Sequence, residues 1–366
     1  MSRRKIDKPF LITVVILIFS GFFIFSSASL GILTKEGSNL SSVLFNQVFL
    51  GLILGTLGMI IASKVNYMHY RKYAFYIFTL SLILSVLVFT PFFGFEHGGA
   101  KRWIMIGGQT FQPAEFLKLG FIIYFAAWLT SIKSKVKTFK YGILPMIILL
   151  ALTGGILLSQ PDTGTFLVIF ITAMGMLFTA GAKWRHLFGL VATAGVGFGI
   201  LTYLRPYVLQ RVLTFMDPSA DALGAGYQIK QSLIAIGSGQ WFGRGFGKSI
   251  QKFNFLPEPM GDSIFAVTAE EWGFIGCIFL IALFLFFAYR GLNIASSSTH
   301  NFGRLLAIGI VILIVSQSFI NMASMLGIFP LTGMPLLFVS QGGTALLFTL
   351  LEVGIIFNIS KYKSRN

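Results

Sequence analysis

The chain has 366 residues, of which 55% are hydrophobic and only 11% are charged. A soluble domain usually carries about 25% charged residues, so this composition excludes a soluble globular enzyme, a disordered chain and a disulfide-stabilised scaffold. The net charge of +16 at pH 7 does not require a nucleic-acid partner, because basic residues gather in the cytoplasmic loops of membrane proteins.

Ten apolar runs follow one another along the chain, and each is long enough, or nearly so, to form a membrane-spanning helix. Glycines inside these runs are typical of close packing between membrane helices. The sequence therefore predicts an all-α polytopic membrane protein, with one domain over residues 1–366 and a long extracytoplasmic loop, residues 205–262, between helices seven and eight. The runs cover residues 10–33, 43–62, 73–93, 114–129, 142–158, 165–181, 187–204, 263–289, 305–326 and 336–359.

Lys and Arg are distributed unevenly between the loops. Most of the 28 Lys and Arg residues precede the first run, follow the tenth, or lie in the loops after the second, fourth, sixth and eighth runs. Because cytoplasmic loops are enriched in these residues, we expect both termini to lie in the cytoplasm. The first run is too long for a cleaved signal peptide and nine runs follow it, so we expect a retained signal anchor.

Two outer loops, 94–113 and 205–262, are longer than the others. Long loops usually carry function or are disordered, and the apolar residues and patterned glycines of 205–262 favour function. Residues 227–237 are amphipathic and are expected to lie flat in the outer interface. Residues 243–249 look like a phosphate loop, but Phe242 occupies the position of the required glycine. The four histidines are scattered and predict no metal cluster.

Charged residues within the apolar runs are costly and therefore informative. Glu115 and Lys118 are three residues apart, so they share one face of the fourth helix. Two interpretations remain open. The pair is either a mutually neutralising ion pair that helps the bundle to pack, or a charge pair that lines a polar cavity.

Three further acids lie at the outer ends of predicted helices. Asp162 follows a proline in a tight turn, where Asp is often only a helix cap. Glu258 stands between two prolines, which hold it in extended backbone. Asp262 precedes the eighth helix and is interpreted either as its N-cap or as a carboxylate at the outer surface, ready to act as a base.

Glu270 comes eight residues after Asp262, about 80° around the helix and about 12 Å deeper. We expect it to line the floor of the same cavity, whereas Glu271 points the other way and needs a different partner. Cations on the outer side run against the usual distribution and indicate an anionic ligand in the outer leaflet. These cations are Lys101, Arg102, Arg205, Arg211, Lys230, Arg244, Lys248 and Lys252.

Several separate segments carry a resemblance to one family. They are residues 100–104 (AKRWI), 111–118 (FQPAEFLK), 160–164 (QPDTG), 227–239 (YQIKQSLIAIGSG), 255–258 (FLPE), 262–267 (DSIFAV) and 330–343 (PLTGMPLLFVSQGG). In these segments, and in its ten runs and long outer loop, the chain resembles the SEDS family (shape, elongation, division and sporulation proteins), the FtsW/RodA polymerases of lipid II. Residues 243–252 look more like the division member than the elongation member.

The resemblance implies inverting glycosyl transfer with an undecaprenyl-diphosphate leaving group, and Asp262 falls on the essential aspartate. The chain departs from the family at Met260-Gly261, where many members have His-Thr, and at Gln341, where many have Tyr. The resemblance and the cost of charge together give these supporting or substrate-binding candidates: Glu258, Glu115, Lys118, Lys101, Arg102, Trp103, Gln112, Asp162, Gln228, Gln231, Arg244, Lys248, Lys252, Glu270, Ser340 and Gly342.

We therefore expect a peptidoglycan glycosyltransferase of the bacterial cytoplasmic membrane that polymerises lipid II, with a role in septal wall synthesis. A lipid II flippase, a scaffold that recruits a transpeptidase and an elongation role remain as alternatives. The expected partners are lipid II, the nascent lipid-linked glycan, a class B penicillin-binding protein and other divisome proteins, without nucleic acid. No cofactor is established, and a divalent cation, Mg²⁺ or Mn²⁺, is left open.

Overall fold

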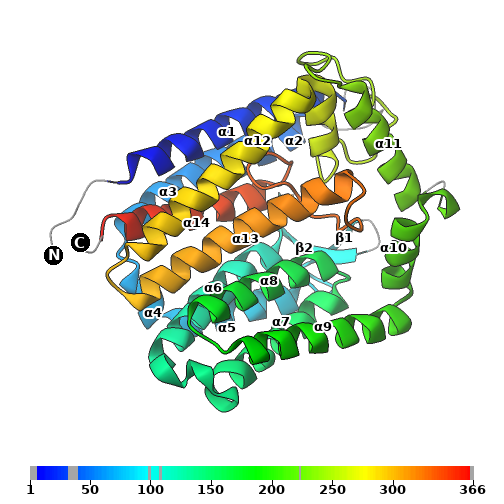
Figure 1. Ribbon diagram of the computed structural model, residues 1–366. Coiled ribbons are helices and arrows are strands. Elements are labelled where there is room, and N and C mark those ends of the chain that lie inside the picture. The colour runs from blue at the N-terminus through cyan, green and yellow to red at the C-terminus, as the bar shows by residue number, and fades with distance from the viewer. Residues whose placement is uncertain (1–5, 32–39, 98–99, 107–108, 222–223, 363–366) are drawn as a thin grey trace.

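A computed structural model describes residues 6–31, 40–97, 100–106, 109–221 and 224–362. In these residues the chain forms a bundle of long apolar helices with one small sheet at one end (Figure 1). The helices are α1 (Lys8–Ser29), α2 (Leu40–Phe45), η2 (Asn46–Leu54), α3 (Gly55–Lys64), α4 (Met68–Lys72), α5 (Ala74–Leu87), α6 (Pro113–Ile132), η3 (Lys133–Lys137), η4 (Phe139–Ile143), α7 (Leu144–Ser159), α8 (Thr163–Thr179), α9 (Trp184–Leu204), α10 (Pro206–Met216), η5 (Pro218–Ala220), α11 (Ala225–Ser238), α12 (Ile264–Ser296), α13 (Asn301–Met325) and α14 (Gly343–Ser360).

Among the described residues, 8 helices are long and apolar enough to cross a membrane. Two shorter apolar helices, α5 and α8, fall on the third and sixth predicted runs. The second predicted run is a continuous helix whose middle, η2, is π-helical. The predicted class of all-α polytopic membrane protein is therefore confirmed, and the count of ten crossings stays a prediction.

The centre of the bundle is formed by α6, α13 and α14. The most apolar stretches of these helices are 61%, 72% and 78% buried, whereas that of α9, at the edge, is only 11% buried. Around the centre, α3 packs on α14, α5 and α8 pack on α6, and α12 packs on α13. Backbones approach closely at small residues, as membrane helices require. A Cβ on Gly354, for example, would lie 2.4 Å from the carbonyl oxygen of Met59.

The two ends of the bundle differ. The first turn of α1 and the last turn of α14 lie at one end, and the sheet, α10 and α11 lie at the other (Figure 1). The sheet consists of β1 (Gly94–His97), β2 (Ala100–Ile106) and β3 (Gln109–Phe111), with both pairs antiparallel. The sequence predicted only a loop here. The amphipathic stretch of the long loop forms α11, whose buried face packs on α12 and α13.

Two helices depart from their predicted form. The tenth run was predicted to become helical at residue 336, but α14 begins at Gly343, and residues 330–342 form mostly buried non-helical backbone. In α12, Gly273 interrupts the helix with φ 67° and ψ −168°. Its backbone lies so close to the 242–243 segment that an added Cβ would be 2.3 Å from the Gly243 nitrogen. Both departures put irregular backbone next to the outer loop.

Candidate active site

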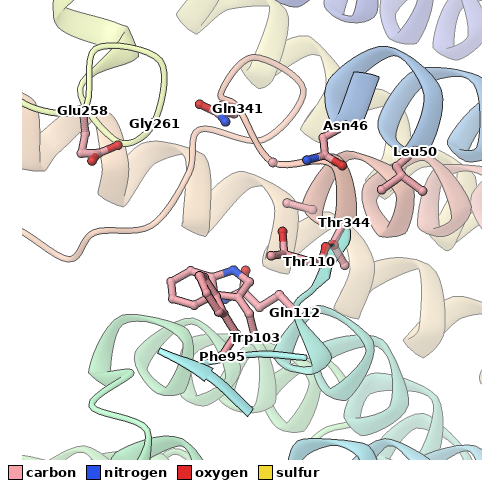
Figure 2. Close-up of a pocket in the computed structure, with 13 residues that line it drawn as sticks. Asn46, Leu50, Phe95, Trp103, Thr110, Gln112, Glu258, Gly261, Gln341 and Thr344 are labelled. Carbon is pink, nitrogen blue, oxygen red and sulfur yellow. Dashed lines mark hydrogen bonds between the residues drawn. The ribbon is translucent and has the colours of Figure 1, made fainter. Parts of the chain in front are cut away.

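A cavity of about 380 Å³ opens between the sheet, the long outer loop and the segment that leads into α14. Figure 2 shows Trp103, Phe95 and Gln112 on one side of it and Glu258 and Gln341 on another. The 13 lining residues are Asn46, Leu50, Phe95, Trp103, Thr110, Gln112, Glu258, Gly261, Gln341, Gly342, Gly343, Thr344 and Ala345. Four predicted site residues, Trp103, Gln112, Glu258 and Gly342, thus meet at one cavity.

Asp262 lies next to this cavity, directly after its lining residue Gly261 and two residues before α12 begins. Gln228 on α11 donates its amide Nε2 to the Asp262 Oδ1 at 3.0 Å and to the Ser263 hydroxyl at 2.9 Å. Asn321 on α13 donates to the Asp262 main-chain carbonyl at 2.8 Å. The carboxylate and the backbone of Asp262 are therefore held by two different helices.

The surroundings of Asp262 change its acidity. Burial raises the pKa of the Asp262 carboxyl to about 6, and the neighbouring Glu258 carboxylate adds to this rise. The hydrogen bond from Gln228 and the positive charge of Arg211 act in the opposite direction. At pH 7 the group is still ionised, and it accepts a proton from a hydroxyl more readily than an ordinary Asp does. The site thus contains a carboxylate suited to act as a general base.

The loop of Glu258 and Asp262 is fastened to the non-helical segment before α14. The Ser340 hydroxyl donates to the Gly261 carbonyl at 2.6 Å, and the Gln341 backbone N–H donates to the Met260 carbonyl at 2.7 Å. Gln47 on η2 holds the same segment, since its amide bonds both the Ser340 carbonyl and the Gly342 N–H. These bonds explain why residues 336–342 leave the helical path, because their polar groups hold the loop.

Glu115 and Lys118 form a buried ion pair within the bundle. Their charged atoms are 2.8 Å apart, and the side chains are 3% and 1% exposed. The Lys118 ammonium also donates to Gln317 Oε1 at 2.7 Å. Neither residue lines the cavity. Of the two interpretations from sequence, the structure therefore shows the mutually neutralised pair.

Arg102 and Asp162 meet at the turn before α8. The Arg102 guanidinium donates to the main-chain carbonyls of Gln160 and Pro161. Asp162 caps α8, because its Oδ1 accepts the Thr165 N–H at 3.1 Å. The capping interpretation of Asp162 is confirmed, and Arg102 is fixed at the outer end of the bundle beside Trp103 of the cavity.

Glu270 does not line the floor of the cavity, so that expectation is wrong. Its carboxylate binds the glycine-rich loop instead, accepting the Ile250 N–H at 3.0 Å, and lies 3.5 Å from Arg244. The partner that Glu271 required is Lys252, at 2.7 Å. Lys252 is completely buried and also donates to Ser27 of α1. Lys252 is therefore part of a structural network rather than a free cation beside the cavity.

The remaining predicted residues lie on the surface of the outer end. Lys101, Arg244 and Lys248 are exposed, and Gln231 is half-buried on α11. Sequence reasoning missed Asn46 and Gln47, which meet the cavity or its wall, and Gln317 and Asn321 on α13. Uncharged amides within an apolar run were the available signal, because such groups need a partner in a membrane.

A protein-bound metal ion finds no ligand set in the residues described. They contain no group of three or more His, Cys, Asp or Glu side chains that could hold such an ion. The divalent cation left open by the sequence stays a prediction.

The sequence of this chain is similar to those of known proteins over nearly its whole length. The family model of FtsW, RodA and SpoVE, described as cell cycle proteins, matches residues 8–365. The chain belongs to this family. It is 37% identical to a probable peptidoglycan glycosyltransferase FtsW of Geobacter sp. (strain M18), over 97% of this chain and 96% of that protein. It is 34% identical to stage V sporulation protein E of Bacillus subtilis (strain 168), over 99% of each.

Two solved structures share the fold over almost the whole chain. One belongs to a peptidoglycan synthase complex that coordinates polymerisation and crosslinking, with a TM-score of 0.80 and 27% identity over 98% of this chain and 99% of that one. The other is the rod shape determining protein RodA of Thermus thermophilus, with a TM-score of 0.69 and 26% identity over 98% of each chain.

Proposed function

We propose that this protein is a peptidoglycan glycosyltransferase that polymerises lipid II at the outer face of the bacterial cytoplasmic membrane, for septal wall synthesis. Relatives similar over nearly the whole chain carry that activity in their names. The observation that carries the proposal is Asp262, a half-buried carboxylate beside the cavity with a pKa raised to about 6. Asp262 is bonded by Gln228 of α11, and α11 lies at the end of the bundle opposite to the first turn of α1 and the last turn of α14, which fits an outer-face reaction (Figure 1).

The chemistry requires a base for the attacking hydroxyl and cations that stabilise the negative charge of the leaving diphosphate. Asp262 takes the proton from a sugar 4-hydroxyl, whose oxygen then bonds to the anomeric carbon of the second lipid-linked disaccharide. The bond from that carbon to the diphosphate breaks, and the polyprenyl diphosphate leaves with the electron pair, so the configuration is inverted. The transition state has oxocarbenium character, which a nearby carboxylate also stabilises. The diphosphate needs cations rather than a general acid, and Arg102, Arg244 and Lys248 are the proposed ones.

Both substrates are membrane lipids, so their sugars reach the cavity from the outer leaflet. The proposed partners are lipid II, the growing glycan, a class B penicillin-binding protein and other divisome proteins. The similarity to a chain of a peptidoglycan synthase complex supports a crosslinking partner. The termini are proposed to be cytoplasmic, which agrees with the Lys and Arg distribution.

Extension of labelled lipid II by the purified protein tests the proposal, with and without a class B penicillin-binding protein. Long glycan is the expected product. If no glycan forms in either sample, the polymerase proposal is contradicted and lipid II translocation across vesicles becomes the next assay. The flippase alternative gains no support from Glu115 and Lys118, which neutralise each other away from the cavity.

The pH dependence of the reaction follows from the acidity of Asp262. The base must be ionised, so we expect kcat/KM to fall about tenfold per pH unit below pH 6 and to level off above pH 7. Gln228→Leu removes a hydrogen bond that lowers this pKa, so the acid limb should move to higher pH. Initial rates between pH 5 and 8, normalised to folded protein, provide the measurement. A rate that is flat down to pH 5 would contradict the role of Asp262 as base.

A further inference from the structure

Two amide side chains on α13 hold the non-helical segment before α14. Gln317 and Asn321 are one helical turn apart, and each is only 1% exposed. Gln317 Nε2 donates to the Pro335 carbonyl at 3.2 Å, and Asn321 Nδ2 donates to the Met334 carbonyl at 2.8 Å. The two carbonyls lie in non-helical backbone. The amides therefore supply partners that burial makes necessary.

Each amide also makes a second bond, to a group on another part of the molecule. The Oε1 of Gln317 accepts from the Lys118 ammonium at 2.7 Å, and this ammonium is 2.8 Å from Glu115. The Nδ2 of Asn321 donates to the Asp262 main-chain carbonyl at 2.8 Å. A continuous series of bonds thus runs from the ion pair on α6 to the backbone of Asp262.

We propose that Gln317 and Asn321 are positioning residues that set the place of Asp262 relative to the Glu115–Lys118 ion pair. Together with the Met334–Pro335 backbone they form an amide bridge between the two. The ion pair lies away from the cavity lining, so its effect on the reaction passes through this bridge and not through contact with substrate. The inference rests on the proposed polymerase activity and names the residues that orient its base.

The geometry makes the reaction sensitive to the amide bridge. A base must lie within hydrogen-bond reach of the proton that it removes, and a misplacement of about 1 Å costs up to about 100-fold in rate. The Asp262 carboxylate accepts a side-chain hydrogen bond from Gln228, which stands on α11 of the long outer loop. Asn321, in contrast, ties the Asp262 backbone to α13 at the bundle centre. The Asn321 hydrogen bond therefore connects the Asp262 backbone to the buried centre of the bundle.

Three substitutions separate the bonds of the amide bridge. Asn321→Leu removes the donor to Asp262 and Met334 at similar volume. Gln317→Glu keeps an acceptor for Lys118 but loses the donor to Pro335, whereas Gln317→Met loses both. Ser318→Ala is the matched control, because Ser318 is also fully buried on α13 and its hydroxyl donates to the Ile314 carbonyl of its own helix.

Steady-state kinetics with lipid II and amide hydrogen exchange on the purified full chain give two independent readouts. We expect Asn321→Leu and Gln317→Glu to lower kcat at least about tenfold while KM for lipid II changes less than about twofold. Exchange in peptides that contain Gly261, Ser263 and Gln341 should become about tenfold faster in Asn321→Leu. Ser318→Ala should match the wild type in both readouts.

A double-mutant cycle tests the connection to the ion pair. Lys118→Met and Asn321→Leu share no hydrogen bond, yet their losses in kcat should not multiply if both act through Asp262. Fully multiplicative losses in folded proteins would overturn the proposal, as would Gln317→Glu at wild-type kcat. Unchanged exchange near Asp262 in Asn321→Leu would also overturn it, even if the wild type made no glycan. Faster exchange together with an inactive wild type would instead refute only the polymerase function.

Discussion

Asp262→Asn is expected to lower the initial rate of lipid II polymerisation by about 10²–10⁴-fold, which is the usual contribution of a general base. Asn has the shape of Asp but takes no proton. Gln228 still has an acceptor for its amide, and the Asp262 carbonyl still receives the bond from Asn321. The measurement is the length and amount of labelled glycan formed by equal amounts of folded protein.

Stability provides the control for folding. Folding raises the pKa of Asp262 from about 3.9 in an unfolded chain to about 6. The ionised carboxylate therefore lowers the stability of the folded protein at pH 7. This loss of stability disappears as the pH falls through about 6 and the group is protonated. Neutral Asn at position 262 should therefore leave the melting temperature equal or higher at pH 7.

Glu258→Gln is the matched variant for activity, because Glu258 lines the same cavity. It should keep polymerisation within about tenfold of wild type. Equal product from Asp262→Asn and wild type would make Glu258 the next candidate for the base.

The helices of the bundle could be predicted because hydrocarbon demands long uninterrupted apolar runs. The predicted bounds of the fourth run, 114–129, agree with α6 at Pro113–Ile132 within a turn. The prediction from sequence was wrong where polar groups of an apolar run bond to a loop instead of forming a helix. Residues 336–342 are apolar enough for a helix, yet Ser340 and Gln341 bond the Asp262 loop and α14 starts only at Gly343.

The local parts of the site were predictable from spacing. Glu115 and Lys118 pair because three residues bring side chains to one helix face. Asp162 caps α8 because Asp before a helix accepts its free N–H groups. Distant pairings leave no such pattern. Glu271 and Lys252 meet because the glycine-rich loop folds back onto α12 at Gly273, a turn that neither hydropathy nor helical period records.

The same fold-back makes Lys252 a large contributor to stability. We expect Lys252→Met to destabilise the folded protein by about 3–5 kcal/mol, since it leaves the Glu271 carboxylate buried without its cation. Two hydrogen bonds to Glu271 would remain, from Ser27 and from the Ser249 N–H. They compensate only part of the charge. In a chain of this size the change corresponds to a fall in melting temperature of about 5–10 °C.

Thermal unfolding of the purified protein at pH 7 measures this effect, with Lys248→Met as the matched control. Lys248 lies four residues earlier in the same loop but is exposed, so its loss should change stability by less than about 0.5 kcal/mol. The double variant Lys252→Met/Glu271→Gln should recover part of the loss, because no uncompensated charge then remains in the interior. Equal melting temperatures for Lys252→Met and Lys248→Met would show that the Lys252 ammonium is not paired with Glu271 in the folded protein. Lys252 would then again be a candidate cation for binding a diphosphate.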